Sequence, residues 1–230
     1  MCGRYRLSRK DQWAQYFEVD PFDDFEPRYN IAPTQNVPVV REGARGREVA
    51  IMRWGLIPSW AKDSSISSSL INARGETVVE KPAFGDSFVL RRCLIPADGF
   101  YEWKRSGRTK QPYHFGMRDE SVFAFAGIWD RWLNAAGEIV ESCSILTTQA
   151  NALLSDVHDR MPVILPRSGF REWLSSRHAD VESLTKLLVP LDAGQMTRYP
   201  VSTLVNRPEN DSPECAKEVA AAPENLELWS

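Results

Sequence analysis

The sequence predicts an α+β protein built on a curled, mainly antiparallel sheet that forms an incomplete β-barrel, with short helices at its periphery. Many short stretches rich in β-branched and aromatic residues alternate with Gly, Asp or Asn, which is typical of antiparallel strands. The few helical patterns lack the regular strand–helix alternation that parallel winding needs. At 230 residues, 43% of them hydrophobic, the chain is long enough to bury a large core.

The strands are expected at residues 37–40, 48–54, 93–95, 100–104, 122–129, 139–147 and 196–201. A Gly-containing turn joins the strands at 37–40 and 48–54 as a hairpin. A second turn, at residues 134–137, joins the strands at 122–129 and 139–147 as another hairpin. Short helices are expected from residue 8 and at residues 74–81, 151–154, 170–175 and 181–188. Ser8 and Asp11 have the spacing of a capping box for the first helix, and the serine-rich residues 64–69 predict an exposed loop.

Charge divides the chain into two parts. Residues 208–230 hold six acids and one lysine, a net charge of −5, whereas the whole chain carries −3 and residues 1–207 therefore carry +2. We expect a folded domain over residues 1–207 and an acidic C-terminal tail over 208–230. A local basic patch, rather than the net charge, is what a polyanion feels within a Debye length of about 8–10 Å.

Composition also bears on location and cofactors. No stretch reaches the roughly 18–20 apolar residues needed to span a bilayer, and no secretory signal is recognisable. The expectation is a cytoplasmic monomer, nucleoid-associated in a bacterial host, with no membrane partner. The four cysteines form no C-x-x-C pair and the three histidines are scattered, so we expect neither a metal site nor another cofactor, and no disulfides.

Position 2 carries the residue with the most specific chemistry. If Met1 is removed, Cys2 bears an α-amine and a thiol on adjacent carbons. The amine condenses with an aldehyde to a Schiff base, and the thiol then closes a five-membered thiazolidine ring. Reference pKa values of about 7.7–8.0 for the amine and about 8.5 for the thiol leave part of each nucleophilic near neutrality. Four cations and no acid within residues 1–10 favour an anionic aldehyde.

Five segments carry a resemblance to a known family. They are Met-Cys-Gly-Arg-Tyr at residues 1–5, Asn-Ala-Arg-Gly-Glu at 72–76, Asp-Gly-Phe-Tyr-Glu-Trp at 98–103, Thr-Thr-Gln-Ala-Asn at 147–151 and His-Asp-Arg-Met-Pro at 158–162. In this order they resemble the SOS-response-associated peptidase (SRAP) family, also called abasic-site-processing proteins. The resemblance runs from residue 1 to about residue 207 and leaves out the acidic tail.

The resemblance implies a protein that senses abasic sites in single-stranded DNA. Cys2, freed by loss of Met1, would attack the ring-opened aldehyde at C1′ and form a covalent thiazolidine DNA–protein crosslink. The crosslink would shield the lesion from strand cleavage. Self-removal of Met1 would be a limited peptidase activity, and an AP-lyase activity is compatible with the same imine chemistry.

The resemblance also implies roles for individual residues. Asn72 corresponds to the residue that orients the cysteine, Glu102 to the acid/base, and His158 to the residue near the deoxyribose oxygen. The family's phosphate contacts fall on Arg4, Arg74 and Arg160.

Apart from the resemblance, imine formation and opening of the sugar ring require the same types of residue. Imine formation needs a proton acceptor and donor, which one partly desolvated carboxyl such as Glu102 can supply. A histidine suits proton delivery to O4′, and an asparagine carbonyl can hold a free amine. The alternatives are an outward-facing strand carboxylate for Glu102, a loop histidine for His158 and a turn-forming Asn72.

Aromatic residues add to the predicted DNA interface. Stacking on aromatic side chains contributes about 1–3 kcal/mol per base to single-strand binding. Trp54 and Trp60 flank a flexible segment and are predicted to wedge against the bases beside the lesion, although core burial is the alternative for any tryptophan. Three further tryptophans, Trp13, Trp129 and Trp173, are expected in the core. His114 is expected in a strand with its ring satisfied by neighbours, and His178 at the surface.

Two other functions use the same features. An N-terminal-nucleophile cysteine peptidase or amidohydrolase would attack amides with Cys2, would need the same loss of Met1, and would leave the arginines without a purpose. A non-enzymatic DNA-binding module would make Cys2 incidental. The three functions differ in whether single-stranded DNA with an abasic site gives a heat-stable adduct.

Overall fold

The computed structural model describes residues 2–22, 25–107, 109–175 and 180–221. Its strands are β1 (Tyr5–Leu7), β2 (Arg28–Ile31), β3 (Asn36–Gly43), β4 (Gly46–Trp54), β5 (Asn72–Arg74), β6 (Arg92–Ala97), β7 (Gly99–Ser106), β8 (Thr109–Met117), β9 (Phe123–Leu133), β10 (Ile139–Gln149), β11 (Arg160–Pro162), β12 (Ile164–Leu165) and β13 (Met196–Pro200). The α-helices are α1 (Lys10–Phe17), α2 (Gly85–Leu90), α3 (Phe170–Leu174) and α4 (Val181–Lys186). Short 3₁₀ helices are Ser64–Ser69, Gly75–Glu80, Arg167–Gly169, Ala193–Gln195, Thr203–Asn206 and Pro213–Ala216.

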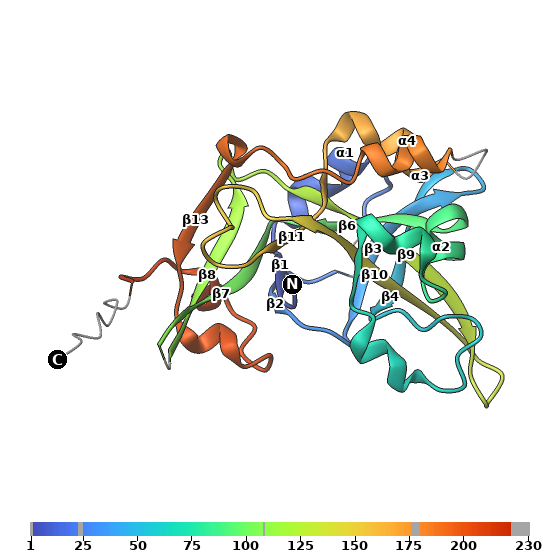
Figure 1. The fold of residues 1–230 in the computed structure, drawn as a ribbon, viewed down its shortest axis with the longest axis horizontal. Helices are drawn as coiled ribbons and strands as arrows, with labels where there is room; N and C mark the ends of the chain where they lie inside the picture. Colours follow the sequence, from blue (N-terminus) through green and yellow to red (C-terminus); the bar gives the residue numbers. More distant parts are fainter. Residues whose placement is uncertain (1, 23–24, 108, 176–179, 222–230) are drawn as a thin grey trace.

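Two sheets make up the body of the protein (Figure 1). One has five strands in the order β13-β8-β7-β1-β2, and the other has eight, with the order β11-β10-β4-β3-β6-β9-β12 and β5 paired to β10. Pairing of β9 with β10 closes β10, β4, β3, β6 and β9 into a ring. The predicted α+β class with a curled, mainly antiparallel sheet is confirmed, because only the pairings of β10 with β4 and β5 are parallel.

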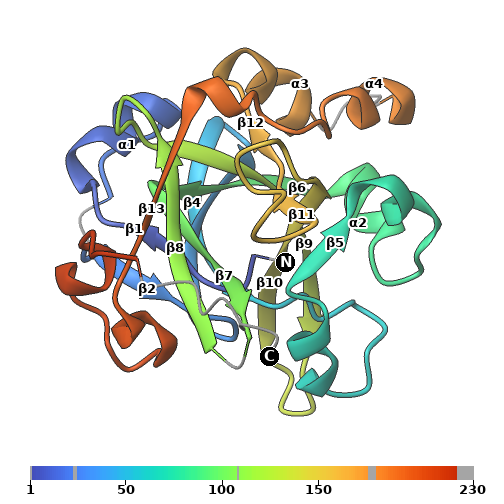
Figure 2. The same ribbon diagram turned by 60° about the vertical axis from the view of Figure 1, so that its left-hand side comes forward.

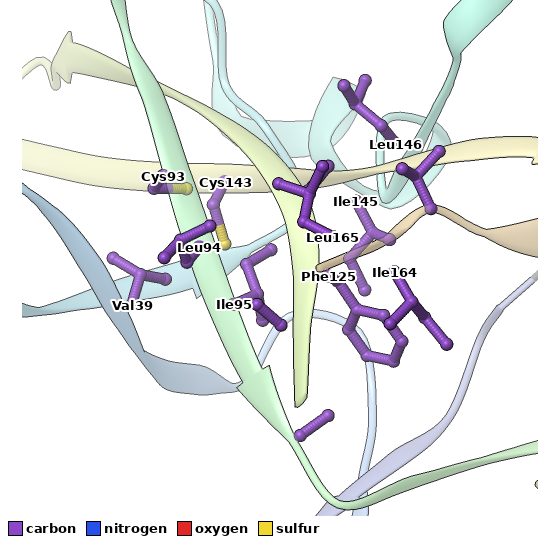
Figure 3. Packing of buried hydrophobic residues seen from close by; sticks show 14 of the residues in the cluster. Val39, Cys93, Leu94, Ile95, Phe125, Cys143, Ile145, Leu146, Ile164 and Leu165 are labelled. Carbon is purple, nitrogen blue, oxygen red and sulfur yellow. The ribbon is translucent and has the colours of Figure 1, made fainter. Parts of the chain in front are cut away.

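The core joins the two sheets. Side chains of β6, β9 and β10 fill the interior of the ring, among them Cys93 and Cys143 (Figure 3). Tyr5 on β1 reaches the ring strands with edge-to-face contacts at 5.2 Å to Trp54 and 5.8 Å to Phe125, measured between ring centroids. The first strand of the chain is therefore held from both sides, by its neighbours β2 and β7 and by the aromatic core.

The helices lie at the periphery, as predicted (Figure 2). Helix α1 packs through Phe17, whose ring stacks on Phe170 at 5.7 Å. The predicted capping box is wrong: the residue before α1 is Arg9, with no side-chain cap, and Ser8 donates its hydroxyl to Asp98 instead. Among the described residues, no helix has the length and apolar character needed to cross a bilayer.

Other predicted elements are confirmed or corrected by the structure. The hairpins β3–β4 and β9–β10 form as expected. The helix expected over residues 74–81 is wrong, because β5 ends at Arg74 and only a 3₁₀ helix follows. Residues 151–154 form turns rather than a helix. The serine-rich loop is a 3₁₀ helix in which Ser67 is buried. Strands β1, β2, β5, β8, β11 and β12 and helix α2 are not predicted.

Part of the segment expected to be a tail is packed on the five-stranded sheet. Asp211 accepts hydrogen bonds from the backbone N–H groups of Tyr29 (2.5 Å) and Asn30 (2.9 Å), which lie on the edge strand β2. The Asn30 amide in turn donates to three backbone carbonyls of residues 205–210. Cys215 is buried beside Tyr101. Residues 222–230 lie outside the described part.

A buried carboxylate ties the start of the chain to β7. Asp98 accepts bonds from the Arg6 guanidinium (2.5 Å), the Ser8 backbone N–H (2.6 Å) and hydroxyl (3.0 Å), and the Arg9 backbone N–H (2.7 Å). Because Asp98 immediately precedes β7, and its donors lie in β1 (Arg6) or directly after it (Ser8 and Arg9), the carboxylate fixes the two strands relative to each other.

Asp98→Asn is expected to lower the free energy of unfolding by about 3 kcal/mol. An amide has one acceptor oxygen where the carboxylate has two, so some of the buried donors lose their partner. Urea unfolding followed by tryptophan fluorescence measures the change. Asp86→Asn, at an exposed position on α2, is the matched control and should change stability by less than about 0.5 kcal/mol. Equal stabilities of the two variants would contradict this role of Asp98.

Candidate active site

The second residue of the chain lies in the interior. Cys2 is completely buried, and the segment that leads from it into β1 is held to β7 by a hydrogen bond from the Tyr101 N–H to the Arg4 carbonyl (3.0 Å). The Cys2 thiol donates weakly to the same carbonyl, with sulfur and oxygen 3.9 Å apart. Burial raises the pKa of the thiol, and the negative charge of Glu102 raises it further. The thiol is therefore protonated at neutral pH.

Asn72 fixes Cys2 from the other side. Its amide nitrogen donates to the Cys2 carbonyl at 2.8 Å. Pairing of β5 with β10 places Asn72 opposite Ile145 and turns it toward the interior. The amide oxygen of Asn72 is buried and has no hydrogen-bond partner among the described residues. A buried acceptor without a partner, next to Cys2, favours the binding of an N–H donor.

Glu102 lies on β7, opposite Tyr113 of β8. Its side chain is only 4% exposed, and burial raises the pKa of its carboxyl group to about 7. A carboxyl group with such a pKa is divided between its two protonation states near neutral pH, so it can both take up and deliver protons. This is the environment that the aromatic neighbours of Glu102 predict.

His158 lies in the turn before β11. Its Nδ1 accepts a hydrogen bond from the Arg160 N–H at 2.9 Å, and burial lowers the pKa of the imidazole. We therefore assign the neutral ring, with its proton on Nε2. The Asp159 carboxylate, also 2.9 Å from Nδ1, becomes an ion-pair partner only when the ring is protonated.

Glu102 and His158 line one cleft, of about 460 Å³, together with Trp103, Arg105, Lys110, Asp156 and Val157. Cys2 is buried next to this cleft, within the electrostatic reach of Glu102. In the view of Figure 1, β1 lies between β7 on one side and β10 on the other. The structure thus brings Cys2, Asn72, Glu102 and His158 together from four separate parts of the chain.

Three comparisons with known proteins show what the chain is similar to. The model of the family described as "SOS response associated peptidase (SRAP)" matches residues 1–208. The chain is 46% identical over 220 residues to abasic site processing protein YoqW of Bacillus subtilis, covering 93% of this chain and 98% of that protein. Abasic site processing protein HMCES of Mus musculus is 34% identical over 252 residues, which covers 93% of this chain and 68% of HMCES.

The chain belongs to the SRAP family. A crystal structure of a protein from Bacteroides thetaiotaomicron has the same fold, with a TM-score of 0.79, 29% identity, and coverage of 95% of this chain and 97% of that one. The family match ends at residue 208, whereas this SRAP protein pairs with its own C-terminal segment as far as Val219, whose N–H donates to the Pro200 carbonyl at 2.9 Å.

The three predicted phosphate contacts of this SRAP protein differ in availability. Arg74 is exposed at the end of β5. Arg160 makes a two-point ion pair with the Glu76 carboxylate, at 2.7 and 2.8 Å, and donates to the Thr147 carbonyl. Arg4 donates to Asn30 and to the Val205 carbonyl, so its guanidinium is held in place by the C-terminal segment.

The two tryptophans predicted to wedge against bases also differ. Trp60 has 58% of its surface exposed, and its indole N–H points at the Pro82 carbonyl at 3.4 Å. Trp54 is completely buried, and its N–H donates to the Ile71 carbonyl at 2.9 Å. The prediction that Trp54 contacts DNA is wrong in this structure, because packing against Tyr5 leaves its ring inaccessible.

The structure also corrects the predicted surroundings of two residues, Trp129 and His114. Trp13 and Trp173 are buried, but Trp129 is only partly buried under the Arg41 guanidinium. His114 lies on β8 as predicted, yet neither ring nitrogen has a hydrogen-bond partner among the described residues, so the expectation of a satisfied ring is wrong. His178 lies outside the described part.

Several residues near the site were not predicted, although most lie inside the family segments. Examples are Asp98, Glu76 and Thr147. Their place in the segments that resemble the family was the only sequence feature that pointed to them. In the part of the chain that the structure describes, no group of three His, Cys, Asp or Glu side chains could hold a metal ion. All four cysteines are present as thiols.

Glu102→Gln is expected to stabilise the protein at pH 8. A carboxyl pKa raised by burial from 4.5 to about 7 makes folding more favourable below pH 4.5 and progressively less so as pH rises toward 7. Removing the charge should recover on the order of 2 kcal/mol at pH 8 and little at pH 4. Urea unfolding at both pH values checks this, and an equal effect at pH 4 and pH 8 would contradict it.

Proposed function

We propose that this protein, after loss of Met1, traps abasic sites in single-stranded DNA as a thiazolidine crosslink through Cys2. The observation that carries the proposal is the buried Cys2 beside an unsatisfied Asn72 oxygen and a carboxyl group, Glu102, with a pKa near neutrality. The relatives named as abasic site processing proteins support the same substrate. Residues 1–207 form the catalytic unit in this proposal.

The first step is imine formation. The Asn72 oxygen accepts a hydrogen bond from the liberated α-amine, and ionised Glu102 removes a proton from the ammonium form. The amine nitrogen then attacks C1′ of the ring-opened sugar, and protonated Glu102 returns its proton to the departing hydroxyl. One water molecule leaves. The amine reacts first, because burial keeps the thiol of Cys2 protonated.

The second step closes the ring. The sulfur of Cys2 adds to the imine carbon, and the thiol proton moves to the nitrogen, so no further atom is lost. Before these steps the sugar ring opens: ionised Glu102 takes the proton of the C1′ hydroxyl, and O4′ receives a proton from His158 in its protonated form, which pairs with Asp159. A five-membered ring is less prone to hydrolysis than the open imine, which accounts for a lasting adduct.

DNA binding is assigned to Arg74, Arg160, Arg4 and Trp60. Arg74 is exposed at the end of β5, the strand that carries Asn72. A phosphate would replace the Glu76 carboxylate as the partner of the Arg160 guanidinium. An abasic nucleotide has no base to unstack, so its sugar enters the cleft at lower cost than that of a paired nucleotide.

The mature protein is expected to give a heat-stable adduct with single-stranded DNA that carries one abasic site, seen as a shifted band on a denaturing gel. Cys2→Ala keeps an amine but lacks sulfur, so it should give only an imine that borohydride traps, with strand cleavage by β-elimination. Cys2→Ser should behave like Cys2→Ala, because an oxazolidine reverts readily. An undiminished heat-stable adduct from Cys2→Ser would contradict the role of the thiol. Release of amines from a peptide or amide, without an adduct, would favour the amidohydrolase.

Arg74→Gln is expected to weaken binding of the same strand and to lower the slope of log affinity against log salt by about 0.7, the value for one phosphate contact in single strands. Fluorescence anisotropy over a range of salt concentrations measures the slope. Lys62→Gln, an exposed substitution with the same change of charge, is the control. Equal slopes for the two variants would move the phosphate contact away from Arg74.

A further inference from the structure

The β7–β8 hairpin carries a like-charge pair that the protein leaves uncompensated. Arg105 and Lys110 are directly opposite each other in the register of the two strands, and both are exposed. Like charges at directly opposed positions destabilise a sheet. Neither side chain makes an ion pair with any acid in the described part of the chain. Because this repulsive pair lines the cleft, an anion bound there would offset the repulsion.

The acids that line the same cleft do not supply that compensation. The Asp156 carboxylate is already bound by Arg198 and lies 3.3 Å from the Lys104 ammonium. Glu102 is buried in the depth of the cleft. The positive charge of Arg105 and Lys110 therefore faces the cleft mouth, where an external anion is the available partner.

Lys110 also connects two hollows. It lines the 460 Å³ cleft of Glu102 and His158 and a second hollow of about 230 Å³, which Trp103 and Asn206 complete. Trp103 lines both hollows, and its indole N–H donates to the Asn206 side chain at 2.7 Å. The two hollows thus share Trp103 and Lys110 and lie next to each other, from the candidate active site toward the C-terminal segment.

We propose that Arg105 and Lys110 bind backbone phosphates of the single strand where it leaves the cleft along the β7–β8 hairpin. This inference rests on the proposed function and extends it to a second contact surface. The surface lies across the site from two of the three predicted phosphate contacts, because β5 and β11, which carry Arg74 and Arg160, lie on the other side of the site from β7 and β8 (Figure 2). The third, Arg4, lies over the Trp103 ring on the hairpin side. The strand would be held at both ends of the cleft, with the abasic sugar between.

The test uses binding of a single strand with a tetrahydrofuran abasic analogue, which has no aldehyde and cannot react. Arg105→Gln combined with Lys110→Gln should weaken binding on the order of tenfold or more at low salt and lower the salt slope by about 1.4, the value for two phosphate contacts. The thermal midpoint should not fall, because the substitutions remove a repulsive pair. A lowered midpoint would contradict the like-charge argument.

The matched control removes the same charge elsewhere. The β3–β4 turn and helix α3 lie far from the β7–β8 hairpin (Figure 1). They carry Arg45 and Arg171, which are both exposed. Arg45→Gln combined with Arg171→Gln should leave both affinity and slope within error of the wild type. Equal behaviour of the two double variants would overturn the proposal, since the effect would then come from net charge alone.

Strand truncation tests the path. Shortening the strand stepwise on one side of the analogue should abolish the defect of the hairpin variant, and shortening on the other side should preserve it. A defect that persists for truncations on both sides would overturn the assignment. Failure of the proposed function is distinguished separately: wild-type protein would then give no heat-stable adduct with a true abasic strand, while the hairpin variant would still show the lower salt slope.

Discussion

The structure depends on holding the beginning of the chain inside the protein. Chain termini normally fray at the surface, but Cys2 is completely buried, because β1 pairs with β2 and β7 and Tyr5 packs into the aromatic core. Asp98 fixes the residues that follow β1, and Asn72 fixes the carbonyl of Cys2. Without these anchors a nucleophile at position 2 would have no defined position relative to any acid or base.

Burial then sets the protonation states around Cys2. The same desolvation raises the pKa of Glu102 to about 7, lowers that of His158, and keeps the thiol protonated. A neutral imidazole and a carboxyl group that titrates near pH 7 can exchange protons with a substrate without a large change in charge. Burying these titratable groups lowers the free energy of unfolding. The like charges of Arg105 and Lys110 on the β7–β8 hairpin also lower it.

The sequence predicted the ring strands well, because β3, β4, β6, β9 and β10 are short apolar runs with clear turns between them. Strands β1, β2, β5, β8, β11 and β12 were missed because they are short or rich in polar residues, and pairing with other strands defines them. The motif residues of the site could be found from their order along the chain. Trp54 and Trp60 could not be told apart, since local sequence does not reveal that only one faces the core. Long-range partners such as Asp98 with Ser8, or Asp211 with β2, leave no local pattern at all.

The central claim is that the amino end of Cys2 traps the sugar aldehyde with both its nitrogen and its sulfur. The most direct measurement is peptide mapping by mass spectrometry of protein incubated with a short single strand that carries one abasic site. The account predicts that the adduct is found only on the N-terminal peptide beginning with Cys2, with the mass of peptide plus DNA less one water. An adduct on an internal lysine, or full reaction by protein that still begins with Met1, would contradict it.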